Sequence, residues 1–254
     1  MTTFLTFCRK ELLESVRTYR LWIMLAAFLV LGLMNPLTAK LLPALLNGAD
    51  IGGVTIQMPD PTALDSWTQF FKNVSQLGGL ALIIVFAGLA GTDLSRETLV
   101  IILAKGANRP AIIMAKLGVA ALIWTASYGL CLGTTWAYNE YYWGAQNLPN
   151  AWLAFGAPWL FGLLMLACIG LGGVLAKNLY GGLIAPIGVY IGLSIVNLAP
   201  STARYNPASL AGSTLGLLNG QSIPNEFTPA ALICATGVIV LVAASVLVFN
   251  KRSL

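Results

Sequence analysis

The chain is dominated by apolar runs of about 20 residues that recur along its whole length. A run of this length, coiled as an α-helix, crosses about 30 Å of hydrocarbon. Only 9% of the 254 residues are charged, whereas roughly a quarter are charged in soluble proteins. The sequence therefore predicts an all-α, polytopic membrane protein that forms one transmembrane domain over residues 1–254, without a sizeable soluble module.

Six membrane-spanning helices are expected. They are placed at residues 21–46, 74–92, 117–138, 152–176, 179–199 and 229–249. Residues 1–20 predict an amphipathic helix at the membrane surface, because apolar residues recur at three- and four-residue steps. The segment 200–228 is almost uncharged, and its apolar middle is too short to span. We expect an outer re-entrant half-helix there, with an ordinary outer loop as the alternative.

Basic residues are distributed unevenly between the two sides that six spans define. Eleven of the fourteen fall on the side of the termini, against three on the other. The eleven are Arg9, Lys10, Arg17, Arg20, Arg96, Lys105, Arg109, Lys116, Lys177, Lys251 and Arg252, and the three are Lys40, Lys72 and Arg204. Because short loops rich in Lys and Arg stay in the cytoplasm, both termini are predicted to be cytoplasmic.

Residues 93–116, between the second and third expected spans, form a polar segment with a wholly apolar middle at residues 99–104. A solvated loop does not need such a run, and a spanning helix does not tolerate the charged flanks. We interpret the segment as a short amphipathic helix at the cytoplasmic face with a docking role. A loop that only fixes the orientation of the chain is the alternative.

Residues that carry chemistry are scarce. The sequence has no histidine and no CxxC spacing, so a zinc, haem or di-iron site is not expected. No nucleotide-binding, nucleophile-elbow or metalloprotease motif is present, and no acidic residue lies deep inside spans two to six. The net charge of +5 sits beside apolar runs, where membrane orientation explains it, so a nucleic-acid partner is not expected. We expect no enzymatic activity and no cofactor in this chain.

Glycine pairs four residues apart occur in two expected spans, at Gly129 and Gly133 and at Gly188 and Gly192, and a further run is Gly170, Gly172 and Gly173. Such spacing lets helix backbones approach closely. Packing inside the bundle is the favoured explanation, and a dimer seam is the alternative.

Two clusters resemble those of the ABC-2 type permeases, the membrane subunits of bacterial ATP-binding-cassette exporters. The first is Arg9, Lys10, Glu11 and Leu12 with Arg17, which looks like the connecting, or elbow, helix of that family. The second runs from Gly91 through Asp93, Arg96 and Glu97 to Lys105, Arg109 and Lys116. This chain has Gly106 and Ala107 where members of the family usually have a proline.

The resemblance implies a half-transporter in a bacterial plasma membrane. It implies pairing with a second permease copy or a paralogue, and with two ATPase subunits that hold ATP and magnesium. Residues 94–104 would form the coupling helix. The residues implied in ATPase coupling are Asp93, Leu94, Arg96, Glu97, Leu99, Lys105 and Arg109, and those implied in the elbow helix are Arg9, Lys10, Glu11 and Arg17.

The expected function is export of an amphipathic or hydrophobic substrate, such as a peptide, lipid or drug-like molecule, because the predicted spans bury so little charge. The alternatives are a self-contained small channel or carrier, and an immunity or sensor subunit that transports nothing. The sequence does not identify the substrate.

Overall fold

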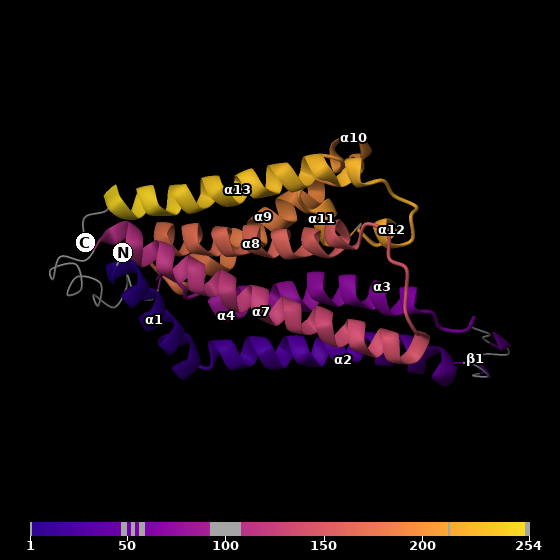
Figure 1. Ribbon diagram of the computed structural model, residues 1–254. Helices are drawn as coiled ribbons and strands as arrows, with labels where there is room; N and C mark the ends of the chain where they lie inside the picture. Colours follow the sequence, from indigo (N-terminus) through magenta and orange to yellow (C-terminus); the bar gives the residue numbers. More distant parts are fainter. Residues whose placement is uncertain are drawn as a thin grey trace.

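Long helices that run side by side account for most of the structure, a computed structural model shown in Figure 1. It describes residues 2–46, 50–51, 54–55, 59–91, 108–212 and 214–251. In chain order the elements are α1 (Thr2–Arg17), α2 (Arg20–Leu46), β1 (Asp50–Ile51), β2 (Val54–Thr55), α3 (Ala63–Asn73), the π-helix η1 (Val74–Gly78), α4 (Gly79–Phe86), α7 (Arg109–Trp143), α8 (Ala151–Ala176), α9 (Leu179–Val196), α10 (Pro200–Ala203), α11 (Ser209–Gly212), α12 (Leu215–Leu218) and α13 (Pro224–Lys251). The two short strands pair antiparallel.

Among the described residues, six helical segments are long and apolar enough to cross a membrane: α2, the continuous run α3–η1–α4, α7, α8, α9 and α13. This confirms the prediction of an essentially all-helical fold with six spanning segments. The start of α1 and the end of α13 lie at one end of the bundle, which we call the termini end, and β1 lies at the opposite, far end (Figure 1). The structure contains no membrane, so the cytoplasmic location of the termini stays a prediction.

The second spanning segment begins at Ala63, within a stretch expected to be loop, and not at residue 74. Its first turn is capped by Asp65, whose carboxylate accepts hydrogen bonds from the backbone N–H and the hydroxyl of Thr62, both at 2.8 Å. This capping box starts the helix early. The third segment also begins before its expected start at residue 117, at Arg109, with a proline in its first turn, a position that proline favours.

Helix α8 is the centre of the bundle, since it contacts α4, α7, α9, α11, α12 and α13. At its far-end half the ring of Phe155 lies within 6.0 Å, centroid to centroid, of four other aromatic rings, those of Trp67, Phe70, Phe71 and Trp136. These rings come from α3 and α7. Because each buries a large apolar surface, the cluster fixes α3, α7 and α8 against one another.

Glycines let α8, α9 and the end of the second span touch at the termini end. A Cβ on Gly172 would collide with the carbonyl of Gly181, and a Cβ on Gly182 would collide with that of Ala87. The expectation of close packing inside the bundle therefore holds for Gly172. It is wrong for the pairs at 129/133 and 188/192, where a Cβ would meet no atom of the described chain within 4 Å.

Within the range 1–20, residues Thr2–Arg17 form the helix α1, and its location at a membrane surface stays a prediction. A turn at Tyr19, whose φ of 61° is left-handed, separates α1 from α2. On this helix Glu11 is buried against the bundle, while Leu5 and Leu12 are exposed.

The segment 200–228 does not form one half-helix. It holds three four-residue helices, α10, α11 and α12, before α13 begins at Pro224. Leu210, Leu217 and Leu218 are buried, and α11 and α12 contact α8 and α3. The segment therefore closes the far end of the bundle, and whether it re-enters a membrane stays a prediction.

Candidate functional site

A buried ion pair joins α1 to the third span at the termini end. Lys116 Nζ lies 2.9 Å from Glu11 Oε2, and the two side chains are only 3% and 5% exposed. Two charges removed from water are tolerated only when each is paired and hydrogen-bonded. The sequence places these residues 105 positions apart, so the pair fixes α1 onto α7 and not onto its neighbour in sequence.

Lys10 extends this pair toward the surface. Its Nζ lies 2.9 Å from Glu11 Oε1 and 2.8 Å from Glu14 Oε2. Burial by itself lowers the pKa of Lys10, but the hydrogen bonds and charges of Glu14 and Glu11 outweigh it and raise the pKa well above its usual range. The two other predicted elbow cations, Arg9 and Arg17, are exposed and border a shallow hollow on α1. Of the four predicted elbow residues, Lys10 and Glu11 therefore contact each other, whereas Arg9 and Arg17 lie on the exposed surface of α1.

Arg109 is the only predicted coupling residue that the described chain includes. Its Nη1 donates to the backbone carbonyl of Asn250, 3.4 Å away near the end of α13. Asp93, Leu94, Arg96, Glu97, Leu99 and Lys105, with the expected coupling helix at residues 94–104, lie outside the described residues. On either side of that segment, Gly91 packs against Asn178 between α8 and α9, and Asn108 caps the start of α7, which lies at the termini end (Figure 1).

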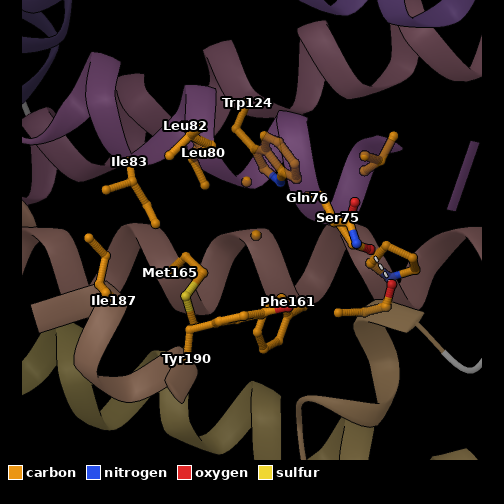
Figure 2. A pocket seen from close by; sticks show the side chains of 15 residues that line it. Ser75, Gln76, Leu80, Leu82, Ile83, Trp124, Phe161, Met165, Ile187 and Tyr190 are labelled. Carbon is orange, nitrogen blue, oxygen red and sulfur yellow. Dashed lines mark hydrogen bonds between the residues drawn. The ribbon is translucent and has the colours of Figure 1, made fainter. Parts of the chain in front are cut away.

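The candidate site is a cavity of about 250 Å³ inside the bundle, between the second span and α7, α8 and α9. Figure 2 shows its walls, which carry Leu80, Ile83, Trp124, Phe161, Met165 and Tyr190. Most of this lining is apolar, and the polar side chains in it are Ser75, Gln76 and Tyr190. A concave, mostly apolar space with few polar groups is the usual form of a small-molecule site.

A more polar space of about 390 Å³ adjoins the cavity at the far end, and the two share lining from Ser75, Gln76, Tyr190 and Ala211. The polar space adds hydrogen-bonding and charged groups: Thr68, Lys72, Ser194 and Asn197. The amide oxygen of Asn197 is buried without a hydrogen-bond partner in the described chain. We call these two adjoining spaces, one mostly apolar and one more polar, the span-2 cavity.

The π-helix η1 shapes the span-2 cavity at the point where its apolar and polar parts meet. Ser75 and Gln76 belong to η1, and the hydroxyl of Ser75 donates to the carbonyl of Ala211 in α11. A π-turn widens the helix and leaves its backbone bonds irregular, which is why such turns are frequent at functional sites. Gly79, directly after η1, lines the cavity and has no atom of the described chain within 4 Å of a Cβ built on it.

A polar network inside the bundle holds the helices around this point. Asn73 Nδ2 donates to Asn35 Oδ1 at 2.8 Å, and Asn35 Nδ2 donates to Thr135 Oγ1 at 3.1 Å. The three residues come from α3, α2 and α7. Because these amide and hydroxyl groups satisfy one another, the network locks three spans in register next to η1.

Sequence reasoning did not find the cavity residues. A helical period runs through Leu64, Trp67, Phe70, Phe71 and Val74 and continues into the polar pair Ser75-Gln76. That pattern indicated an earlier helix start and a polar site inside the second span. Trp124, Phe161 and Tyr190 carry no such signal, because their meeting depends on how three separate helices pack.

In the described part of the chain no three His, Cys, Asp or Glu side chains gather in a way that could hold a metal. The six long apolar helices of the described chain indicate a multi-pass helical membrane protein. No protein-family model matches the chain, and no curated protein or solved structure is similar enough to match it.

Proposed function

We propose that this chain is the membrane subunit of an ATP-driven exporter, and that the span-2 cavity receives an amphipathic cargo. The observation that carries the proposal is the two-part cavity, apolar in its inner part and polar at the far end. Such a site fits a molecule with an apolar body and a polar end. The energy source in this proposal is a separate ATPase, as the resemblance to ABC-2 type permeases implies.

Contacts at the termini end offer a route by which movement of an ATPase could reach the membrane helices. Glu11 and Lys116 bind α1 to α7, and Arg109 binds the start of α7 to the end of α13. Residues 92–107 connect the second span directly to α7. A force applied to that segment would therefore move α1, α7 and the end of the second span together. Rigid-body displacement of this kind is a common switching mode.

The partner is tested by co-purification. A tagged chain should capture a soluble ATPase that carries a phosphate-binding loop, and the double reversal Arg96→Glu with Glu97→Arg should abolish capture. Lys177→Glu is the matched control, because Lys177 is an exposed cation at the same end, between α8 and α9, outside the proposed docking helix. The control should capture normally, and both variants should insert into the membrane to the same extent.

A chain that purifies alone, and that conducts ions or moves substrate in vesicles without any ATPase, would contradict the proposal. That result would favour the alternative of a self-contained channel or carrier.

The cavity is tested by filling it. Gly79→Leu places a side chain into open space, so the variant should fold normally while the transport rate of an amphipathic cargo falls at least about tenfold. Gly118→Leu is the control, because Gly118 is an exposed helical glycine of α7 with nothing near its Cβ and does not line the cavity. Equal transport by both variants would exclude the span-2 cavity from the cargo path.

A further inference from the structure

A second, smaller cavity lies at the far end of the bundle, apart from the span-2 cavity. It measures about 130 Å³ and is lined by side chains from α3, the end of α7 and the connection to α8, chiefly Trp67, Trp136, Asn139, Glu140 and Gln146. We call it the tryptophan niche. None of its lining residues belongs to the span-2 cavity.

Asn139 makes the niche unusual. Its side chain is 1% exposed, and neither its amide oxygen nor its amide nitrogen has a hydrogen-bond partner in the described chain. A buried amide without partners is costly, and buried polar side chains in native proteins nearly always have one. By contrast, the indole N–H of Trp67 is already used, since it donates to Gln146 Oε1 at 2.9 Å. The unmet donor and acceptor therefore sit on one residue that faces the niche.

The remaining lining favours a positive charge. The rings of Trp67 and Trp136 lie 5.7 Å apart, centroid to centroid, and Glu140 adds a carboxylate. Indole faces attract cations, and tryptophan does so more strongly than the other aromatic residues. A carboxylate beside two indoles is thus a favourable setting for an ammonium group.

The amide oxygen and amide nitrogen of Asn139, which have no hydrogen-bond partner in the described chain, further restrict the class of ligand that fits. Its amide oxygen can accept from an ammonium N–H, which a quaternary ammonium lacks, and its amide nitrogen must donate to an oxygen. The niche volume of about 130 Å³ would hold about four waters at ~30 Å³ each. A ligand group of four non-hydrogen atoms occupies a similar volume. We propose that the tryptophan niche binds a primary ammonium with a neighbouring oxygen acceptor, the chemistry of ethanolamine.

Two sources supply this chemistry where helices leave a bilayer: an aminophospholipid headgroup and a free amino alcohol. The niche would bind its ligand whether or not the chain exports anything. The proposal is therefore independent of the proposed function.

The test is ¹⁹F NMR on the full chain labelled with 5-fluorotryptophan, which gives signals from its seven tryptophans. The Trp67 and Trp136 signals are assigned by substitution with phenylalanine. In detergent, ethanolamine should shift both signals saturably, while the signal of Trp22, which lies on α2 outside the niche, should stay in place. Ethylene glycol, a neutral molecule of the same size, should shift neither. In nanodiscs free of amines, phosphatidylethanolamine but not phosphatidylglycerol should reproduce the shift if a lipid is the source.

Two substitutions in the niche test its polar groups. Asn139→Leu should raise the apparent Kd for ethanolamine roughly tenfold, and Glu140→Gln should raise it about threefold or more. Glu226→Gln is the matched control, because Glu226 is an exposed carboxylate at the start of α13 that does not line the niche. Glu140 is exposed, so its variant keeps the test valid even where the Asn139 variant fails to fold.

Saturable shifts with free ethanolamine, or with phosphatidylethanolamine alone, support the site and identify its source. Equal shifts with ethylene glycol, no shift with either amine, or full binding by both niche variants would overturn it. The niche would then hold only water.

Discussion

At the residue scale, the interaction that most constrains this chain is the one between Glu11 and Lys116. Both side chains are nearly fully buried, and their charged atoms are 2.9 Å apart. Removing one partner from a buried pair is far more damaging than removing both, because a single charge is left in a medium that solvates it poorly. The pair therefore holds α1 in one position on α7, because any other position of α1 would leave a buried charge unpaired.

We expect Glu11→Leu or Lys116→Met alone to lower the free energy of unfolding by about 3–5 kcal/mol. The double variant Glu11→Leu with Lys116→Met should lose much less than the sum of the two. A double-mutant cycle from thermal unfolding in detergent measures this coupling. Additive losses would mean that the two charges do not stabilise each other.

Lys10→Met is the control for that cycle, since the Lys10 side chain is 45% exposed and surface ion pairs contribute about 0–1 kcal/mol. The small loss in the free energy of unfolding caused by Lys10→Met should be the same at pH 7 and pH 9. Because the pKa of Lys10 is raised, its contribution is fully present below the usual lysine pKa and is lost only as pH rises through the raised value.

At the scale of elements, the contact between α9 and the end of the second span leaves no room for a side chain. Gly182→Ala would place its Cβ against the carbonyl of Ala87, and a backbone atom cannot rotate away as a side chain can. The two helices must move apart, so we expect a loss of about 1–3 kcal/mol in thermal unfolding. Gly129→Ala, on an exposed position of α7, meets nothing within 4 Å and should be neutral or stabilising by up to ~1 kcal/mol. Equal effects of the two variants would show that α9 is not packed as described.

How well an element could be predicted depends on where its stabilising interactions lie. The span expected at 152–176 is the helix Ala151–Ala176, because an uninterrupted apolar run determines it locally. The span expected at 74–92 begins at Ala63 instead, because the capping box between Thr62 and Asp65 starts the helix ahead of the apolar run. The span-2 cavity and the Glu11–Lys116 pair could not be predicted, because each joins residues of helices that the sequence does not place side by side.

For the whole molecule, burial is unevenly distributed among the spans. Helices α7 and α8 are the most buried, whereas α9 and α13 are the least buried. Ile184, Ile191 and Ile195 of α9 are all more than half exposed, and Gly188 and Gly192 stand open on that helix. A helix that presents apolar side chains and a bare small-xxx-small pair can meet either lipid or the same surface of a second copy, and close glycine spacing favours a second helix.

We expect the second copy, and disulfide crosslinking tests this in native membranes. The background is Cys8→Ser, because the other three native cysteines are buried. In it, Gly188→Cys or Gly192→Cys should give a dimer under mild oxidation, because a two-fold axis places equivalent α9 residues opposite each other. Leu122→Cys, on a 67% exposed position of α7, reports random collision and should remain monomeric. If all three variants stay monomeric, the exposed face of α9 contacts lipid. Gly188 and Gly192 would then not lie in an interface between two copies of the chain.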